Sequence, residues 1–259
     1  MIRIGTSGFD YKDWYGAFFP TGLKPQHRLE YYAQRFHTLE LNITYYQLLS
    51  PGSVMGLINK VETGFDFFIK ANRDLTHGTL KHAKETMVKF AGQANMFRPA
   101  HKLSGVLFQF PATFECSPKN EAYLRWVVES LEKVRVVIEF RHAQWINDHT
   151  MDLLRELNAG YCIMDMPQVK NLPSRRVEAT SDLAYVRFHS QNKAMWEGKA
   201  SRNQRYDYEY SDEELKAWVP VIASLNTQGA KDTYVYFNNH FRGRAARNAQ
   251  TLGSLLKPS

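Results

Sequence analysis

Polar and charged residues end a series of short apolar runs along this sequence, although strands buried on both faces should stay apolar throughout. The run ends include Glu40-Leu41-Asn42, Lys70, Gln109, Glu139-Phe140-Arg141, Asp165, Arg187-Phe188-His189 and Asn238-Asn239-His240. Carboxyl and imidazole groups transfer protons, and arginine and lysine side chains bind anions. We therefore expect these ends to meet at one wet site that binds an anion and moves protons.

Four pairs of these residues lie two positions apart, and residues at that spacing on a strand point to the same face. The pairs are Glu40 with Asn42, Glu139 with Arg141, Arg187 with His189, and Asn238 with His240. Burying all of them against a layer of helices would cost desolvation free energy. Placing these side chains in the open end of a barrel costs less free energy. We expect each arginine to lie near a carboxylate there, and Arg187 to line a solvent-filled cleft.

Three strand-end residues are the catalytic candidates: Glu40, Glu139 and His240. A carboxyl group acts as a general acid or base when its neighbours tune its pKa. The other strand-end residues are assigned to substrate binding: Asn42, Lys70, Gln109, Arg141, Asp165, Arg187, His189, Asn238 and Asn239. Within this set the two arginines and Lys70 would hold an anion, because cationic side chains match phosphate oxygens. A network that only neutralises its own charges is the structural alternative, and it would add little stability.

The segment from Asn238 to Arg244 leads from the last strand-like run into a helix start. Barrel enzymes often bind a phosphate in the loops after their last two strands, against a helix N-terminus. Arg242 would supply charge there and Gly243 would let the backbone approach, so both are anion-binding candidates. A solvated basic turn explains the same segment equally well.

Strand-like runs alternate with segments of helical periodicity along the whole chain. The runs cover residues 2–4, 38–41, 65–69, 103–110, 134–140, 161–164, 184–188 and 233–237, and helical spacing marks 28–36, 54–61, 83–97, 123–131, 151–157, 215–225 and 245–256. Gly160 is expected to end one helix, and Ser211 with Glu214 has the spacing of a capping box. Eight such units predict a single α/β domain over residues 1–259, a (β/α)₈ TIM-barrel-like fold.

Two long connections interrupt this alternation. Residues 165–183 contain Pro167 and Pro173 and lack helical periodicity, so the sixth βα unit should be irregular. Residues 190–210 form the second connection, and both should border the site because loops after the strands rim a barrel mouth. The basic side chains of the second connection should face solvent or an anionic ligand: Lys193, Lys199, Arg202 and Arg205.

Composition narrows the class of protein. The chain of 259 residues is 44% hydrophobic and carries a formal net charge of +7, which is typical of a globular protein and favours an anionic partner. Cys116 and Cys162 have no metal-binding spacing and suggest a reducing compartment. No charged leader precedes the first strand-like run, and no apolar stretch reaches about 18 residues. We expect a cytoplasmic protein with no membrane partner.

Several segments, taken in order, resemble the YecE-like family, which is described as domain of unknown function 72. The resemblance is carried by residues 5–16, 40–46, 105–111, 137–142, 185–189 and 236–240. It implies a TIM-barrel-like fold and no established reaction. This chain has Phe9 where the family usually has Trp, and Ser190 where Gly is common, and both differences touch the expected cleft.

These features favour an enzyme that acts on an anionic, phosphate-bearing small molecule or a nucleic-acid fragment, by general acid–base chemistry of the hydrolase or isomerase type and without a cofactor. A non-catalytic barrel that binds nucleic acid through its basic loops is one alternative. A metal-dependent hydrolase or isomerase is another, with ligands among Glu40, Glu139, Asp165, His189 and His240. No compact ligand spacing supports a divalent metal, and the neighbouring cationic side chains would repel one.

Overall fold

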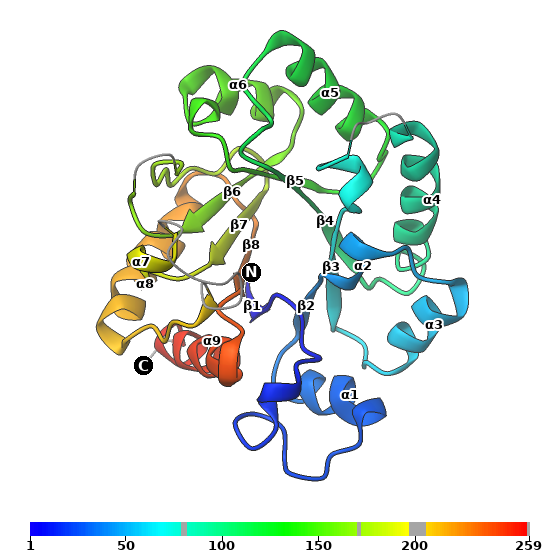
Figure 1. The fold of residues 1–259 in the computed structure, drawn as a ribbon, viewed down its shortest axis with the longest axis vertical. Coiled ribbons are helices and arrows are strands. Elements are labelled where there is room, and N and C mark those ends of the chain that lie inside the picture. The colour runs from blue at the N-terminus through cyan, green and yellow to red at the C-terminus, as the bar shows by residue number, and fades with distance from the viewer. Residues whose placement is uncertain (79–81, 170–171, 197–205, 258–259) are drawn as a thin grey trace.

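Eight parallel strands form a nearly closed barrel, and helices surround it (Figure 1). The structure is a computed structural model that describes residues 1–78, 82–169, 172–196 and 206–257. The strands are β1 Ile2–Thr6, β2 Thr38–Leu41, β3 Asp66–Lys70, β4 Leu103–Phe110, β5 Val136–Phe140, β6 Gly160–Asp165, β7 Leu183–Phe188 and β8 Asp232–Phe237. Their order, β1-β8-β7-β6-β5-β4-β3-β2, follows the chain once around the barrel. The predicted TIM-barrel-like fold is confirmed.

Side-chain caps satisfy free backbone N–H groups at the starts of four helices, α3, α5, α6 and α8, and a proline also begins α3 and α5. They are α1 Arg28–Ala33, α2 Ile43–Tyr46, α3 Pro51–Asn59, α4 Ala83–Asn95, α5 Pro118–Glu129, α6 Asp148–Glu156, α7 Lys193–Trp196, α8 Asp212–Thr227 and α9 Arg244–Leu255. Ser211 and Glu214 form the predicted capping box at the start of α8. None of the helices in the described residues is long and apolar enough to cross a bilayer.

The sixth βα unit is irregular, as predicted. The described residues between β6 and β7, 166–169 and 172–182, contain no helix. One detail of the preceding helix was predicted wrongly: α6 ends at Glu156, and Asn158 takes the left-handed conformation with φ 49°. Gly160 instead starts β6, where an added Cβ would lie 3.1 Å from the Leu183 carbonyl oxygen. Its missing side chain therefore serves the close approach of two strands.

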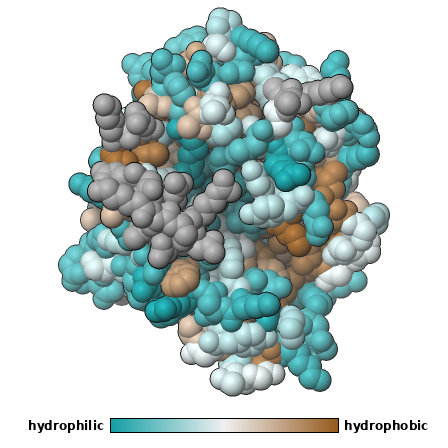
Figure 2. Space-filling model, viewed as in Figure 1, coloured by the Kyte–Doolittle hydropathy of each residue, from teal (hydrophilic) through white to brown (hydrophobic). Residues whose placement is uncertain are grey.

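Apolar and aromatic side chains fill the barrel below its C-terminal end. This inner cluster consists of Phe68, Leu107, Val137, Cys162, Met164, Met166, Leu183, Tyr185, Tyr234 and Tyr236. A larger core lies between the strands and the helices. Hydrophilic residues cover most of the face shown in Figure 2.

The seam between β1 and β2 is the least regular part of the barrel. A single bridge between Ser7 and Glu40 joins the two segments, and the Gly8 N–H donates to the Glu40 carbonyl oxygen at 2.8 Å. Further down, Arg3 Nη1 donates to the carbonyl oxygens of His37 at 3.1 Å and Gly64 at 2.7 Å. A side chain therefore spans the seam where a strand ladder would otherwise run.

Gly105 allows β4 to pack closely inside the barrel, so Gly105→Ala should destabilise the protein. The added Cβ would lie 2.6 Å from Phe68 Cζ and 2.7 Å from the Arg135 carbonyl oxygen, and overpacking of this kind costs ~1–3 kcal/mol. Gly92→Ala in α4 is the matched control, because no atom lies within 4 Å of a Cβ built there. Denaturant unfolding compares the two variants, and an equal effect on the free energy of unfolding would contradict this packing.

Candidate functional site

A buried ion network joins the C-terminal ends of β2, β5 and β7. Arg187 donates from Nη2 to Glu40 Oε1 at 2.7 Å and from Nη1 to Glu139 Oε2 at 2.6 Å. Both carboxylates are 0% exposed, and the Arg187 side chain is 2% exposed. The structure brings these three predicted residues together. The expectation that Arg187 lines a wet cleft was wrong, because the carboxylates on both sides enclose it.

Further hydrogen bonds satisfy the remaining carboxylate oxygens. Glu40 Oε2 accepts from the Tyr185 hydroxyl at 2.6 Å, and Glu139 Oε1 accepts from Arg141 Nε at 2.6 Å. Each arginine therefore contacts a carboxylate, as predicted. Arg141 is the outer of the two, with 14% of its side chain exposed. It is the guanidinium group through which a ligand would reach the network.

The charges in this network hold one another in the ionised state. Burial alone would raise the pKa of Glu139, but the guanidinium groups of Arg141 and Arg187 hold that pKa well below its ordinary value. Burial would lower the pKa of Arg187, and Glu139 and Glu40 raise it well above its ordinary value. Glu139 is therefore a permanent carboxylate near neutral pH. It positions the two arginines and is poorly suited to be a general acid.

His189 is a neutral imidazole between two polar neighbours. Arg141 Nη2 lies 3.0 Å from its Nε2, and the Asn238 side-chain amide lies 3.1 Å from its Nδ1. Burial first and Arg141 second lower the pKa of His189 from 6.5 to about 3. Arg141 Nη2 and Asn238 Nδ2 are both donors, and a neutral imidazole has a single acceptor nitrogen, so His189 accepts a hydrogen bond from one of the two.

Lys70 ends β3 beside this network. Its Nζ donates to Gln109 Oε1 at 3.2 Å and lies 4.6 Å from the centroid of the Tyr45 ring. Within the described residues Lys70 makes no ion pair with a carboxylate. Burial first, and Arg187 second, lower the pKa of Lys70 to about 8. Two neutral groups therefore hold a cation whose charge is lost just above neutral pH.

The cluster carries one positive charge in excess. Lys70, Arg141 and Arg187 are cationic, and Glu40 and Glu139 are the carboxylates that face them. Both carboxylates are already engaged by the arginines, so Lys70 is the cation left without an anionic partner in the described part of the chain. In a site of low dielectric, an excess charge favours binding of an anion.

Two predicted site residues lie outside the cluster. Asp165 follows Met164, which points into the barrel, so its own side chain points outward. There its Oδ1 accepts from Arg175 Nη2 at 2.7 Å, and burial raises its pKa. Asn239 also points outward, and its Nδ2 donates to the Tyr208 carbonyl oxygen and to Asn248 Oδ1, both at 2.8 Å. Both side chains support loops.

His240 and Asn42 lie at the rim of the barrel mouth. The His240 ring stacks on Tyr11 with centroids 4.4 Å apart, and its backbone carbonyl accepts from Trp14 Nε1 at 2.7 Å. Burial lowers the pKa of His240, so the ring is neutral near pH 7. The buried Asn42 Oδ1 has no hydrogen-bond partner among the described residues. A ligand at the mouth would be able to donate to it.

The predicted anion-binding turn is already occupied by carboxylates. The Arg242 N–H donates to Asp13 Oδ2 at 2.6 Å, and Gly243 adopts φ 72° as it precedes α9. Arg247, in the first turns of α9, donates to Glu209 at 2.8 Å. The Arg242 side chain is exposed. The structure therefore separates Arg242 and Gly243 from the cluster at the strand ends.

Both long connections contact the barrel mouth. Leu172 and Trp196 pack against the inner cluster, and the Trp196 ring centroid lies 5.6 Å from Arg141 Cζ. Lys193 is exposed, as expected. The other three basic residues predicted to face solvent or a ligand, Lys199, Arg202 and Arg205, lie outside the described residues.

Three neutral residues that complete the cluster were not assigned to the site from the sequence. Tyr185 binds Glu40, Ser7 Oγ lies 3.3 Å from Arg187 Nη2, and Tyr45 lies against Lys70. Tyr185 lies two positions before Arg187, so the alternation rule that paired Arg187 with His189 could have found it. Ser7 and Tyr45 follow strand ends in the same way, but hydroxyl and aromatic residues are too common there to be distinctive.

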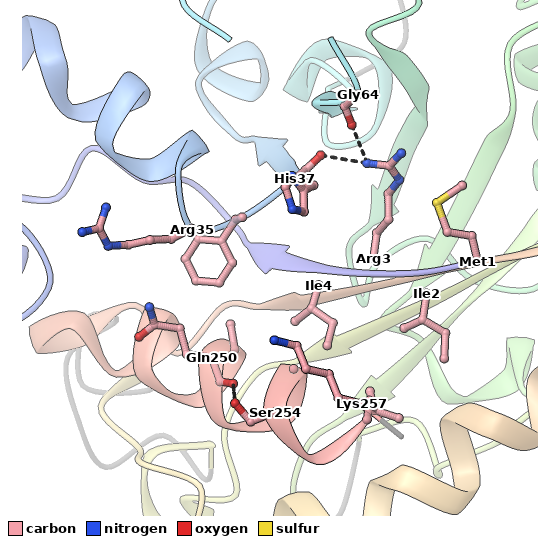
Figure 3. A pocket seen from close by; sticks show the side chains of 14 residues that line it. Met1, Ile2, Arg3, Ile4, Arg35, His37, Gly64, Gln250, Ser254 and Lys257 are labelled. Carbon is pink, nitrogen blue, oxygen red and sulfur yellow. Dashed lines mark hydrogen bonds between the residues drawn. The ribbon is translucent and has the colours of Figure 1, made fainter. Parts of the chain in front are cut away.

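A separate cavity of about 750 Å³ opens at the other end of the barrel, beside the seam (Figure 3). Ile2 and Ile4 of β1 line one side, Gln250 and Ser254 approach from α9, and Lys257 approaches from the segment just after α9. Met1, His37 and Gly64 also line the cavity and precede β1, β2 and β3, so it lies at the N-terminal ends of these strands. This cavity is therefore distinct from the polar cluster.

The candidate metal ligands are not arranged around a common point. Within the described residues, no three His, Cys, Asp or Glu side chains gather closely enough to hold a metal ion. Arg187 lies between Glu40 and Glu139, and Asp165 points outward. A cation at this centre would have to displace a guanidinium group from two short hydrogen bonds.

The chain belongs to the family described as "Protein of unknown function DUF72", whose sequence pattern matches residues 3–259. It is 30% identical over 271 residues to UPF0759 protein YunF of Bacillus subtilis (strain 168), covering 99% of this chain and 95% of that protein. The family resemblance seen in the sequence motifs is confirmed.

Crystal structures of DUF72 family proteins have the same fold. The protein from Thermotoga maritima MSB8 is 36% identical, with a TM-score of 0.91 and 100% of both chains covered. The protein from Enterococcus faecalis V583 is 26% identical, with a TM-score of 0.89, covering 100% of this chain and 96% of that one. SacUVDE, 7% identical with a TM-score of 0.56 and 98% of each chain covered, shares the fold alone.

Removing the central cation should destabilise the protein strongly. Arg187→Met leaves Glu40 and Glu139 buried without their shared partner, which costs ~3–5 kcal/mol in comparable ion pairs. Arg125→Met is the matched control, because Arg125 and its partner Glu156 are 40% and 62% exposed and such pairs contribute less than ~1 kcal/mol. Urea unfolding measures both free energies. A cost for Arg187→Met as small as the control's would contradict the buried network.

His189 should make stability depend on pH below 6.5. Its pKa is lowered from 6.5 to about 3 in the folded chain, so between these values only the unfolded chain binds the proton. Stability therefore falls as pH decreases through this window, by up to ~1.4 kcal/mol per pH unit. His189→Gln should reduce the slope, and His37→Gln, at an exposed position, should keep it. Urea unfolding between pH 7 and 4.5 tests this, and equal slopes would contradict it.

Proposed function

We propose that this protein is an enzyme that binds an anionic, phosphate-bearing small molecule or nucleic-acid fragment at the C-terminal ends of its strands. The observation that carries the proposal is Lys70, a cation of the cluster with no carboxylate partner among the described residues. Lys70 is held by Gln109 and the Tyr45 ring, whereas Glu40 and Glu139 are engaged by Arg187 and Arg141. An anion would complete the balance of charge.

Lys70 and Arg141 are the side chains suited to hold the anion. Arg141 is partly exposed and is held on its inner side by Glu139 and His189, so its orientation is set before a ligand arrives. Preorganised donors bind a developing or resident charge without first reorganising. Arg187 is enclosed, so its role is to fix the two carboxylates. Its positive charge still adds to the potential at the mouth.

The proton-transfer role fits Lys70 better than the carboxylates. Glu139 stays ionised, because its pKa is held well below the ordinary value. His240 is a neutral imidazole at the rim, and its pKa is lowered by burial. The pKa of Lys70, about 8, lies close to the pH at which general acids and bases are most efficient. Lys70 is therefore the favoured acid or base of the proposed reaction, in place of the predicted Glu40 or Glu139.

Lys70→Met should weaken binding of inorganic phosphate by ~10- to 150-fold, the equivalent of ~1.5–3 kcal/mol for a hydrogen bond to a charged group. Lys70→Arg keeps the cation and should retain most of the affinity. Wild-type affinity should fall as pH rises through about 8, where Lys70 loses its charge. Calorimetry and thermal shifts with phosphate, a sugar phosphate and a short single-stranded oligonucleotide measure these effects.

Lys89→Met is the control for this series, because Lys89 is 61% exposed and pairs with Glu85 on α4. It should bind phosphate as the wild type does. The proposal fails if no anion stabilises the wild type, or if the Lys70→Met and Lys89→Met variants respond equally. A response to the oligonucleotide alone, without any to phosphate or sugar phosphate, would limit the substrate to nucleic acid.

A further inference from the structure

We propose that Lys70 is a nucleophile that forms an imine with the aldehyde or ketone group of a phosphate-bearing substrate. This inference rests on the proposed function and narrows it, because it adds a carbonyl group to the anion. The class of reaction would then be one that breaks a C–H or C–C bond next to that carbonyl. The phosphate would lie against Arg141, and the carbonyl carbon against Lys70 Nζ.

The first support is the environment of the amine. Lys70 Nζ has Gln109 Oε1 at 3.2 Å and the face of the Tyr45 ring at 4.6 Å, and neither group is a carboxylate that would fix a positive charge on it. The nearby carboxylates, Glu40 and Glu139, are bound by arginines.

Lys102 shows what a structural lysine looks like in the same fold. It lies just before β4, at the opposite end of the barrel, and its Nζ donates to the carbonyl oxygens of Val61 at 3.0 Å and Glu62 at 2.6 Å. Both acceptors are backbone oxygens of the segment that packs around the Lys102 amine. Lys70 has one side-chain acceptor and a ring face, and it points to the barrel mouth, where a ligand would enter.

The second support is the charge on the neighbours. Burial and the guanidinium group of Arg187 lower the pKa of Lys70 to about 8, so roughly a tenth of the amine is neutral at pH 7. Only the neutral amine attacks a carbonyl carbon. Desolvation together with adjacent cations is the usual way in which proteins activate such a lysine. Arg141 would thus hold the anion, and both Arg141 and Arg187 would keep the amine reactive.

The step balances without any further reactant. The nitrogen of Lys70 forms a bond to the carbonyl carbon, and the C=O double bond opens to a hydroxyl group. Counted from the ammonium form, two of the three nitrogen protons leave with the oxygen as water, and the C=N bond carries the remaining positive charge. That iminium group draws electrons from the adjacent carbon, so a proton or a carbon fragment can leave from there. The charge stays where Lys70 already carried it.

Borohydride trapping tests this directly. The wild-type protein is incubated with sodium borohydride and one carbonyl compound in each of three samples. The compounds are dihydroxyacetone phosphate, 2-deoxyribose 5-phosphate and a single-stranded oligonucleotide with one abasic site. We expect one reduced adduct per chain from at least one of these carbonyl compounds, mapped by peptide mass spectrometry to Lys70 and absent from Lys102. The small-molecule and oligonucleotide arms distinguish a free sugar phosphate from an abasic nucleic acid. Butanone, which lacks phosphate, should label at least tenfold less.

Lys70→Arg is the decisive variant, because it keeps the charge but cannot form a stable imine, and it should lose the adduct at least tenfold. Lys89→Arg, at an exposed position, should be labelled as the wild type is. Absence of trapping in every arm, or labelling that survives Lys70→Arg, overturns the inference. Phosphate-dependent stabilisation measured on the same samples tests the anion-binding function independently of the imine. If this stabilisation persists without trapping, the anion-binding function stands and the imine proposal fails.

Discussion

The position of Arg187 between Glu40 and Glu139 governs the C-terminal end of this barrel. One guanidinium group binds both buried carboxylates at 2.7 and 2.6 Å and thereby ties β7 to β2 and β5. Because both anions are taken by arginines, the partners of Lys70 in the described part of the chain are neutral, and the cluster formed there keeps an excess of positive charge. The proposed chemistry of Lys70 depends on this arrangement as much as on Lys70 itself.

A network of this kind is a poor way to gain stability. Replacing buried ion pairs by apolar side chains of similar size is often neutral or stabilising, and the layer directly below the network is such an apolar cluster. Apolar side chains could therefore have filled the barrel up to the C-terminal ends of its strands. Charged residues at this depth are better explained by a need to orient Arg141 and to set the potential around Lys70 than by the stability of the fold.

Strand periodicity and turn residues were sufficient to predict the barrel, because each βα unit carries its own local signals; β2 and β4 have the predicted bounds. The convergence of Glu40, Glu139, Arg141 and Arg187 followed from their place at strand ends. The burial of each side chain could not be predicted in this way, and Arg187 was therefore expected to contact solvent. The outward direction of the Asp165 side chain depends on where β6 begins. The distinct state of Lys70 arises from Gln109 on β4, Tyr45 on α2 and the charge of Arg187 on β7, a combination that no local pattern encodes.

The central claim is that Lys70 and Arg141 together bind an anion at the barrel mouth. A crystal structure of the protein with bound tungstate, a phosphate mimic located by its anomalous scattering, tests this most directly. We expect the main tungsten peak to place its oxygens within hydrogen-bond distance of Lys70 Nζ and the Arg141 guanidinium group. Peaks confined to other basic sites, such as Arg242 or the cavity beside Arg35 and Lys257, with none at the mouth, would contradict it.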